Sequence, residues 1–255
     1  MSNVFRSAYA SAYDALYQDK DYSAECDILE KIFGRYGRHP IRSILDLGCG
    51  TGNHSIPLAE RGYEVVGVDC AQDMIIAAKS KAKTEKASCA FHLADIKQLN
   101  LNRKFDAAIM MFAVLGYQLE NSDALAALRS ARVHLNPGGV LIFDVWYGPA
   151  VLSQRPSDRI KVISADNKII LRAASGCLDA RSQICKVHYH IWQLDNDILT
   201  AETEEEHEMR FFFSKELELL IKNAGFNLRK LGSFPNFYDD PDENTWNLIS
   251  ICSAE

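Results

Sequence analysis

Residues 44–55 read ILDLGCGTGNHS, a short apolar run followed directly by a glycine-rich turn. An apolar run without polar alternation is typical of a parallel strand that is buried on both faces. Glycines at 48, 50 and 52 would let the backbone approach a ligand closely. A helix beginning near Asn53 would present free N–H groups to a carboxylate. The stretch therefore predicts a ligand site at the end of a buried strand.

Strand and helix patterns alternate along the first part of the chain. We expect strands at 43–47, 65–69, 90–94, 105–112 and 140–146, and helices at 54–61, 72–83 and 123–134. Such alternation implies a parallel sheet with helices on both faces, an α/β fold of the Rossmann-like kind. Beyond residue 147 the period changes to two, which predicts antiparallel strands at 160–163, 168–173, 184–193 and 200–213. A helix at 214–224 and strands at 228–233 and 246–252 would then return to the edge of the main sheet.

These patterns divide the chain into four parts. Residues 1–40 would form an N-terminal helical cap, with a break between its two helices near 19–21. Residues 41–146 would form the ligand-binding Rossmann-like core, and 147–213 an antiparallel β insertion that serves as a lid. Residues 214–255 would complete the core.

Composition excludes several classes of partner. The chain has 255 residues, a formal net charge of −6 and a pI of about 5.7. Nucleic-acid binding rests on clustered Lys and Arg, so this balance argues against a nucleic-acid partner. The 7 cysteines form no CxxC pair, which fits free thiols in a reducing compartment. No secretory signal pattern and no apolar run of the ~20 residues that span a bilayer are present. We therefore expect a cytoplasmic protein without membrane contact.

Two residues of the glycine-rich stretch distinguish between nucleotide cofactors. A dinucleotide site would have a third glycine where this chain has Asn53. Asp46 at the strand end would repel a pyrophosphate, but it suits the cationic ammonium and sulfonium of S-adenosylmethionine (SAM). Asp69 ends the next strand, where an acid accepts hydrogen bonds from ribose hydroxyls in both kinds of site. The charge pattern favours SAM over NAD.

Further along, Asp95 follows the third strand, where it would accept from the adenine amine, with Met74 and Ile96 on either face of the ring. Each of these three is alternatively an ordinary loop or core residue. His188 and His190 share one strand face, but no third ligand is spaced to support them, so we expect no metal.

Five motifs of this sequence occur in the order found in a known family: LDLGCGTG, VVGVD, HLADI, FDAAIMMF and LNPGGVLIFD. With them the chain resembles class I SAM-dependent methyltransferases. More narrowly, YDALYQDKDY, MFAVLGY, FDVW, VHYHIW and HEMRFFFSKELELLIKNAGF resemble the enzymes that N-methylate nucleotide-linked (dTDP) deoxyaminosugars. The resemblance implies a cofactor pocket at Tyr22, Asp46, Gly48, Cys49, Gly50, Asp69, Met74, Asp95, Ile96 and Met111. It implies an acceptor pocket at Tyr13, Tyr117, Asp144 and Trp146.

The chain departs from the family pattern at two places. Ala113 and Val114 stand where a Ser pair is common, and Thr245 stands where an Arg is expected before the last strand. An Arg there would contact a nucleotide phosphate. Arg210, Arg229 and Lys230 are the nearby cations that would substitute for it.

Methyl transfer from a sulfonium is an in-line displacement by a neutral amine, so positioning supplies most of the catalysis. Asp144 lies at a strand end, where open α/β sheets bind ligands, and we expect it to hold the substrate amine. Tyr13 and Tyr117 would orient the amine or a sugar hydroxyl, and Trp146 would line the sugar. The alternative is that Asp144 caps its strand and the tyrosines are packing groups. His207 is a weaker candidate, and the acidic stretch 202–208 reads as a solvated strand face.

The sequence leaves three other functions open. The first is a methyltransferase with a different acceptor, such as another amine, an amino acid or a hydroxyl. The second is an NAD-dependent oxidoreductase, which Asn53 and Asp46 disfavour. The third is a SAM-binding module without turnover. The partner would be a small-molecule acceptor, and the sequence leaves open whether the chain forms a homo-oligomer.

Overall fold

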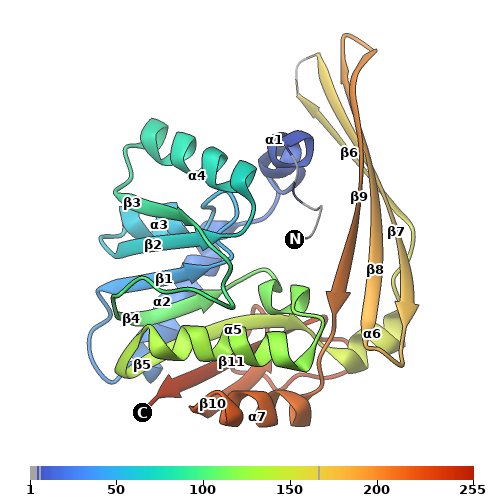
Figure 1. The fold of residues 1–255 in the computed structure, drawn as a ribbon. Coiled ribbons are helices and arrows are strands. Elements are labelled where there is room, and N and C mark those ends of the chain that lie inside the picture. Colours follow the sequence, from blue (N-terminus) through green and yellow to red (C-terminus); the bar gives the residue numbers. More distant parts are fainter. Residues whose placement is uncertain (1–4, 6, 166) are drawn as a thin grey trace.

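The chain folds into two sheets of different kinds, seen in the computed structural model that describes residue 5 and residues 7–165 and 167–255 (Figure 1). A seven-stranded sheet has the order β10-β11-β5-β4-β1-β2-β3, and a four-stranded sheet has the order β6-β7-β8-β9. The elements are α1 (Ser7–Leu16), α2 (Tyr22–Tyr36), β1 (Ser43–Leu47), α3 (Ser55–Glu60), β2 (Glu64–Asp69), α4 (Gln72–Glu85), β3 (Cys89–Leu93), β4 (Phe105–Met110), the 3-10 helix η1 (Val114–Tyr117), α5 (Asn121–Val133), β5 (Leu135–Trp146), α6 (Gly148–Gln154), β6 (Arg159–Ala165), β7 (Lys168–Asp179), β8 (Ile184–Asp195), β9 (Ile198–Arg210), α7 (Ser214–Asn223), β10 (Phe226–Ser233) and β11 (Asn247–Ala254).

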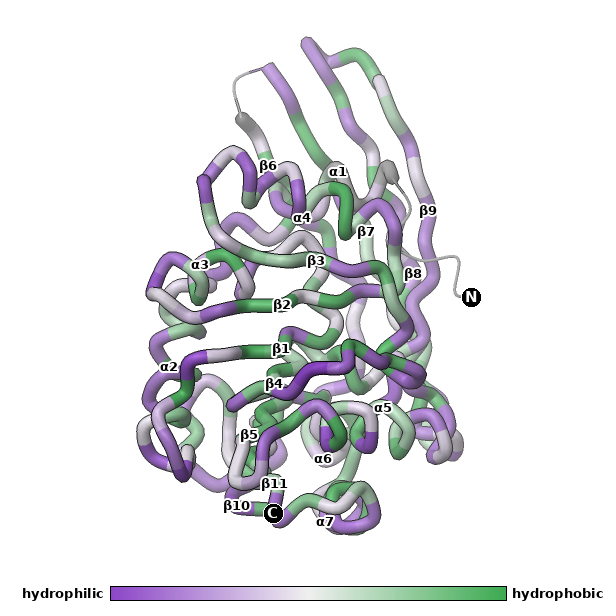
Figure 2. The backbone as a smooth tube through the Cα atoms, turned by 60° about the vertical axis from the view of Figure 1, so that its left-hand side comes forward, coloured by the Kyte–Doolittle hydropathy of each residue, from purple (hydrophilic) through white to green (hydrophobic). Residues whose placement is uncertain are grey.

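The large sheet is parallel from β3 to β5, and β11 and β10 extend it with antiparallel pairings. Its strands are almost continuously apolar because helices cover both faces. Leu45 and Leu47 pack on the face covered by α5 and α7, whereas Ile44 packs on the face covered by α2 and α3. Figure 2 shows hydrophobic stretches within β1 and β2 of this sheet. The α/β Rossmann-like fold expected from the sequence is confirmed.

The four-stranded sheet is the antiparallel insertion, which we call the lid, and it rises beside the core (Figure 1). It begins and ends at the C-terminal end of β5, where Phe212 donates its N–H to the Trp146 carbonyl and accepts from the Gly148 N–H. On one lid face Ile163 and Ile191 pack on α1 beside Leu16. The insertion is thereby positioned over the edge of the core where parallel strands end.

Several boundaries differ from the sequence expectations: β5 begins at Leu135 rather than at 140, and β7 ends at Asp179 rather than at 173. The helix after the glycine turn begins at Ser55 rather than near Asn53, so a turn separates the glycines from the helix. β4 ends at Met110, before the expected end at 112, because Phe112 and Ala113 adopt left-handed backbone conformations (φ 71° and 57°). Helices η1 and α6 were not expected. Their sequences, VLGY and GPAVLSQ, are too short to show a helical period.

All seven cysteines are free thiols. No helix among the described residues is both long and apolar enough to cross a bilayer.

Candidate functional site: a cofactor turn between the cap and the lid

The glycine turn lies at the C-terminal end of β1 and is fastened to β2. The N–H groups of Gly48 and Cys49 both donate to the Val68 carbonyl, at 2.8 and 2.9 Å. Gly48 has φ +78°, and a Cβ atom there would lie 2.6 Å from both γ-carbons of Val114. Gly50 also has positive φ (+53°), but a Cβ there would have no atom within 4 Å. The turn is therefore closed toward η1 at Gly48 and open at Gly50.

Two carboxylates flank this turn, Asp46 buried and Asp69 half-buried. Asp46 is 2% exposed, and its Oδ2 accepts a hydrogen bond from the Ser55 hydroxyl at 2.6 Å. Asp69 accepts from the N–H groups of Gly50 (2.9 Å) and Ala71 (2.8 Å). Burial raises the pKa of both carboxyls, and the charge of Asp69 raises the pKa of Asp46 further. A cationic ligand would stabilise this ionised pair, whereas a pyrophosphate would be repelled by it.

Tyr22 stands at the first position of α2, with its ring edge-on to His54 at a centroid distance of 5.2 Å. Its hydroxyl is buried and makes no hydrogen bond of normal geometry within the described chain. A buried hydroxyl of this kind is stabilised when a ligand supplies the missing partner. Behind it, Glu25 accepts from His54 at 2.8 Å and forms an ion pair with Lys20.

Polar contacts join helix α1 to the glycine turn. The Asp14 carboxylate accepts from the Thr51 hydroxyl at 2.6 Å and from the Asn53 amide at 3.1 Å. Lys81 of α4 completes the group through an ion pair with Asp14 at 2.6 Å. These contacts hold the cap against the glycine turn and would cover a cofactor bound there.

The other expected cofactor residues have unequal surroundings. Met74 (2% exposed) and Ile96 (6%) are buried beside the turn, in different apolar clusters. Cys49 is buried against Ile56 and Ile75, and Met111 packs with the side chains of α2. Asp95 is exposed, and its carboxylate accepts from the Lys97 N–H at 2.9 Å. The residues around the turn thus fit SAM in charge and in the open space at Gly50.

Asp144, from the acceptor set, is 1% exposed near the end of β5. Its Oδ1 accepts from the Ala113 N–H at 3.0 Å, and it therefore supports the left-handed backbone of Phe112 and Ala113. Burial raises the pKa of Asp144 to about 6, and its bonds to those two amides and the charge of Lys20 oppose the rise. An acid with this pKa changes charge close to neutral pH.

Aromatic residues pack against one another between α1, η1 and the lid. The Tyr13 ring lies 4.9 Å from Tyr17, which contacts Phe112 edge-on at 5.0 Å. Burial raises the pKa of Tyr13 and of Tyr117 well above its usual value, which keeps both hydroxyls protonated. The charge of Asp69 contributes to the raised pKa of both tyrosines.

Trp146 lies where β5 ends and meets Trp246 edge-on at 5.5 Å. The adjoining Thr245 is bonded to the Ser233 hydroxyl at 2.8 Å.

Three cations were candidates to replace the Arg expected at Thr245; two of them are bound to other groups and the third is exposed. Arg210 is 4% exposed and is held by Glu216, Asn121 and the Leu119 carbonyl. Lys230 pairs with Asp240 at 2.5 Å, and Arg229 is exposed on the edge strand β10. Arg210 is therefore a structural residue joining β9 to α7. From the sequence, Arg210 was a candidate contact for a nucleotide phosphate. Its ion pair with Glu216 depends on the orientation of the lid, which the sequence does not show.

The histidines of β8 lie on the opposite face of the lid from the site. His190 contacts Glu202 (2.5 Å) and Glu204 (3.2 Å), while Tyr189 and Ile191 of the same strand face α1. His188 is exposed. Both histidines therefore lie on the face of the lid that is turned away from α1. Among the residues that the structure describes, no group of three or more His, Cys, Asp or Glu side chains is arranged to hold a metal.

Comparison with known proteins identifies the family. A family model described as "Methyltransferase domain" matches residues 44–139. The protein named "Putative methyltransferase YqeM" of Bacillus subtilis (strain 168) is 30% identical over 224 residues, covering 88% of this chain and 87% of that protein. The chain belongs to the SAM-dependent methyltransferases. The solved structure of a SAM-dependent methyltransferase from Clostridium acetobutylicum ATCC 824 matches this methyltransferase with a TM-score of 0.82 at 23% identity, over 97% of this chain and 98% of that chain.

Another relative of the methyltransferase carries a more specific name. It is the dTDP-3-amino-3,4,6-trideoxy-alpha-D-glucopyranose N,N-dimethyltransferase of Streptomyces venezuelae, 26% identical over 236 residues. The match covers 91% of this chain and 96% of that enzyme, so it includes most of the lid as well as the core.

Several residues near the site were not expected to be there. Asp14 and Lys81 join the cap to the turn, and Lys20 pairs with Glu25 within the cap. Glu205 is buried at 4% exposure on the core-facing side of the lid. The sequence held a signal for only one of these groups. In YDALYQDKDY, the acid Asp14 interrupts a row of tyrosines at helical spacing, which marks a polar contact within the cap.

Proposed function

We propose that this methyltransferase transfers a methyl group from SAM to the amino group of a small-molecule acceptor, a dTDP-linked deoxyaminosugar. The observation that carries the proposal is the match to the Streptomyces venezuelae N,N-dimethyltransferase over nearly the whole of both chains. An insertion shared with an enzyme of this kind supports a shared kind of acceptor, because the lid adjoins the end of β5. The aromatic side chains between cap and lid also suit contact with the apolar face of a deoxysugar.

The residue roles form part of the same proposal. Tyr22, Asp46, Gly50 and Asp69 would hold SAM, with the other expected cofactor residues packed around them. When bound, SAM supplies an electrophilic methyl group on a positively charged sulfur. Asp144 would hold the acceptor amine by a charge-assisted hydrogen bond. Tyr13 and Tyr117 would orient the amine, and Trp146 would line the sugar.

The test is turnover with a defined acceptor. The protein is incubated with SAM and dTDP-3-amino-3,4,6-trideoxy-α-D-glucopyranose, and mass spectrometry follows product methylation together with release of S-adenosylhomocysteine. We expect one or two methyl groups on the sugar nitrogen. Methylation of an amino acid, a simple amine or a hydroxyl compound in preference to aminosugars would overturn the acceptor assignment.

The roles are tested by Asp144→Asn and Tyr13→Phe. We expect each to lower kcat about tenfold or more with SAM affinity unchanged, because each removes an acceptor contact. Full turnover in both variants would contradict the roles. Leu219→Ala, on the exposed side of α7, is the matched control and should retain wild-type activity.

A further inference from the structure

Helix η1 lies between the glycine turn and the lid and contacts both. At its start, Val114 is the side chain that occupies the space beside Gly48. Near its end, a Cβ on Gly116 would lie 3.0 Å from Met209 Cε and 3.1 Å from the Arg210 carbonyl oxygen, both on β9. The backbone of η1 therefore touches the lid directly, and its last residue, Tyr117, lies between the cofactor side and β9.

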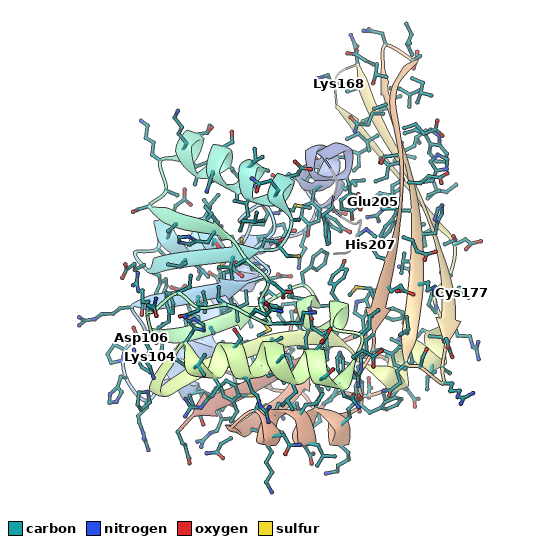
Figure 3. The ribbon with its side chains drawn as sticks, viewed as in Figure 1. Lys104, Asp106, Lys168, Cys177, Glu205 and His207 are labelled. Atoms are coloured by element: carbon teal, nitrogen blue, oxygen red, sulfur yellow. The ribbon has the colours of Figure 1, made fainter. Side chains whose placement is uncertain are left out.

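A buried chain of hydrogen bonds leads from Tyr117 into the lid. The Tyr117 hydroxyl lies 2.9 Å from His207 Nδ1, and His207 Nε2 lies 3.0 Å from Glu205 Oε2. His207 is 2% exposed and Glu205 is 4% exposed. Figure 3 shows both side chains on the face of the lid that is turned toward the core, opposite Cys177. The same Glu205 oxygen accepts from the Phe5 N–H at 2.9 Å.

The tautomer of His207 sets the direction of these hydrogen bonds. An ionised carboxylate only accepts, so His207 Nε2 carries a proton and donates to Glu205. In the tautomer with its single proton on Nε2, Nδ1 is an acceptor and the Tyr117 hydroxyl donates to it. The Tyr117 oxygen accordingly presents lone pairs to the site. The Tyr117 oxygen can therefore accept a hydrogen bond from a ligand group such as an amine N–H, but it has no proton left to donate to a ligand acceptor.

We propose that Glu205, His207 and Tyr117 form a relay that removes the proton from the acceptor ammonium before methyl transfer. The inference rests on the proposed N-methylation. The N–H bond of the ammonium breaks as its proton passes to the Tyr117 oxygen, while the Tyr117 hydroxyl proton passes to His207 Nδ1. The amine keeps its electron pair as a lone pair, and the proton remains on an imidazolium that Glu205 stabilises until solvent takes it up. Tyr117 is the catalytic residue, and His207 and Glu205 act through it.

Two further titratable side chains of the described chain contact His207. They are Tyr9 of α1, at 5.3 Å between ring centroids, and Tyr189 of β8, at 5.1 Å. Burial raises the pKa of both tyrosines. Arg172 lies over the Tyr189 ring at 5.3 Å and donates to the Tyr17 hydroxyl.

His207→Asn separates proton uptake from packing. Asparagine places an amide oxygen near the position of Nδ1, so it keeps the hydrogen bond from Tyr117 but takes up no proton. With dTDP-3-amino-3,4,6-trideoxy-α-D-glucopyranose and SAM, we expect kcat to fall about a hundredfold near pH 7. The loss should disappear as the pH rises above the pKa of the acceptor amine, and SAM affinity should stay unchanged. Tyr117→Phe should give the same profile, and the double variant should lose no more than either single one.

A loss of equal size at every pH, or no loss, would overturn the relay. A wild-type protein that methylates no amine would refute the proposed function, which is a different result. The relay has a readout without turnover, the ¹⁵N NMR spectrum of the full-length protein labelled at histidine. We expect His207 as the tautomer protonated at Nε2. Protonation at Nδ1 would make Tyr117 an acceptor from His207 and would overturn the relay even if the variants failed to fold. Replacing the exposed His188 by Asn is the matched control; it removes only the His188 signals and should leave the His207 signals and the pH profile unchanged.

Discussion

At the scale of single residues, Asp144 links stability to pH. Because burial raises its pKa from 3.8 to about 6, the folded state binds a proton more tightly than the unfolded state. The stability that this carboxyl contributes is fully present below about pH 3.8 and is lost as the pH rises through about 6. An ionised Asp144 that awaits a substrate amine therefore lowers the stability of the empty protein.

Asp144→Asn removes this titration while keeping an oxygen for the Ala113 N–H. We expect the free energy of unfolding of the variant, relative to wild type, to rise by about 1 kcal/mol between pH 5 and pH 7.5. Urea denaturation at the two pH values measures the difference. Parallel pH dependences in the two proteins would contradict the assigned shift.

Gly48 is the second residue with a specific requirement. Gly48→Ala combines a positive φ with a Cβ 2.6 Å from the Val114 γ-carbons, so the turn must shift. We expect SAM affinity to fall about tenfold or more by calorimetry. Gly62→Ala is the control, since Gly62 has φ +95° but open space around it, and it should lose about 1 kcal/mol of stability with SAM affinity retained. Wild-type binding by Gly48→Ala would refute the predicted clash, and Val114→Ala should partly rescue the variant.

At the scale of elements, α1 is a cover that polar contacts hold in place. The Asp14 carboxylate joins it to Thr51 and Asn53 of the turn and to Lys81 of α4. These contacts involve a half-exposed acid, so each is weak on its own. Together they decide how tightly the cap closes over a ligand.

Asp14→Asn should loosen this cover. We expect SAM to bind roughly three- to tenfold more weakly, and the amides of α1 to exchange hydrogen faster, because the ion pair to Lys81 is lost. Glu218→Gln removes an equivalent charge from a remote ion pair on α7 and should change neither quantity. Unchanged exchange in α1 of the Asp14 variant would show that apolar packing alone holds the cap.

At the scale of the whole molecule, the site lies where three parts meet: the cap, the parallel sheet and the lid. The lid starts and ends at the C-terminal end of β5, and η1 contacts both the glycine turn and β9. Cofactor and acceptor binding should therefore stabilise contacts between parts that are distant in sequence.

SAM at a hundred times its Kd should raise the free energy of unfolding by about 2.7 kcal/mol. For a protein of this size we expect Tm to rise by roughly 5–10 °C in a thermal unfolding experiment. S-adenosylhomocysteine should act in the same direction, whereas NAD should leave Tm unchanged. A shift with NAD and none with SAM would contradict the proposed cofactor site.

The sequence predicts the parallel sheet well because the signals are local. Each buried strand is a short apolar run, each cofactor-side turn follows it directly, and a glycine pattern such as LDLGCGTG carries its own backbone requirement. The ends of β4 and the helix η1 were missed. Phe112 and Ala113 adopt left-handed conformations that Asp144 supports from another strand.

The amino-acid sequence by itself determined the α/β fold, the lid as an antiparallel insertion and the position of the SAM-binding turn, since these depend on periodicity and on neighbouring residues. The tertiary structure alone decided which residues of the lid face the site. Glu205 and His207 follow one another at strand spacing among exposed glutamates, and only the packing of β9 against η1 turns them inward. Tyr117 and His207 are separated by 90 residues, so no local pattern could bring them together.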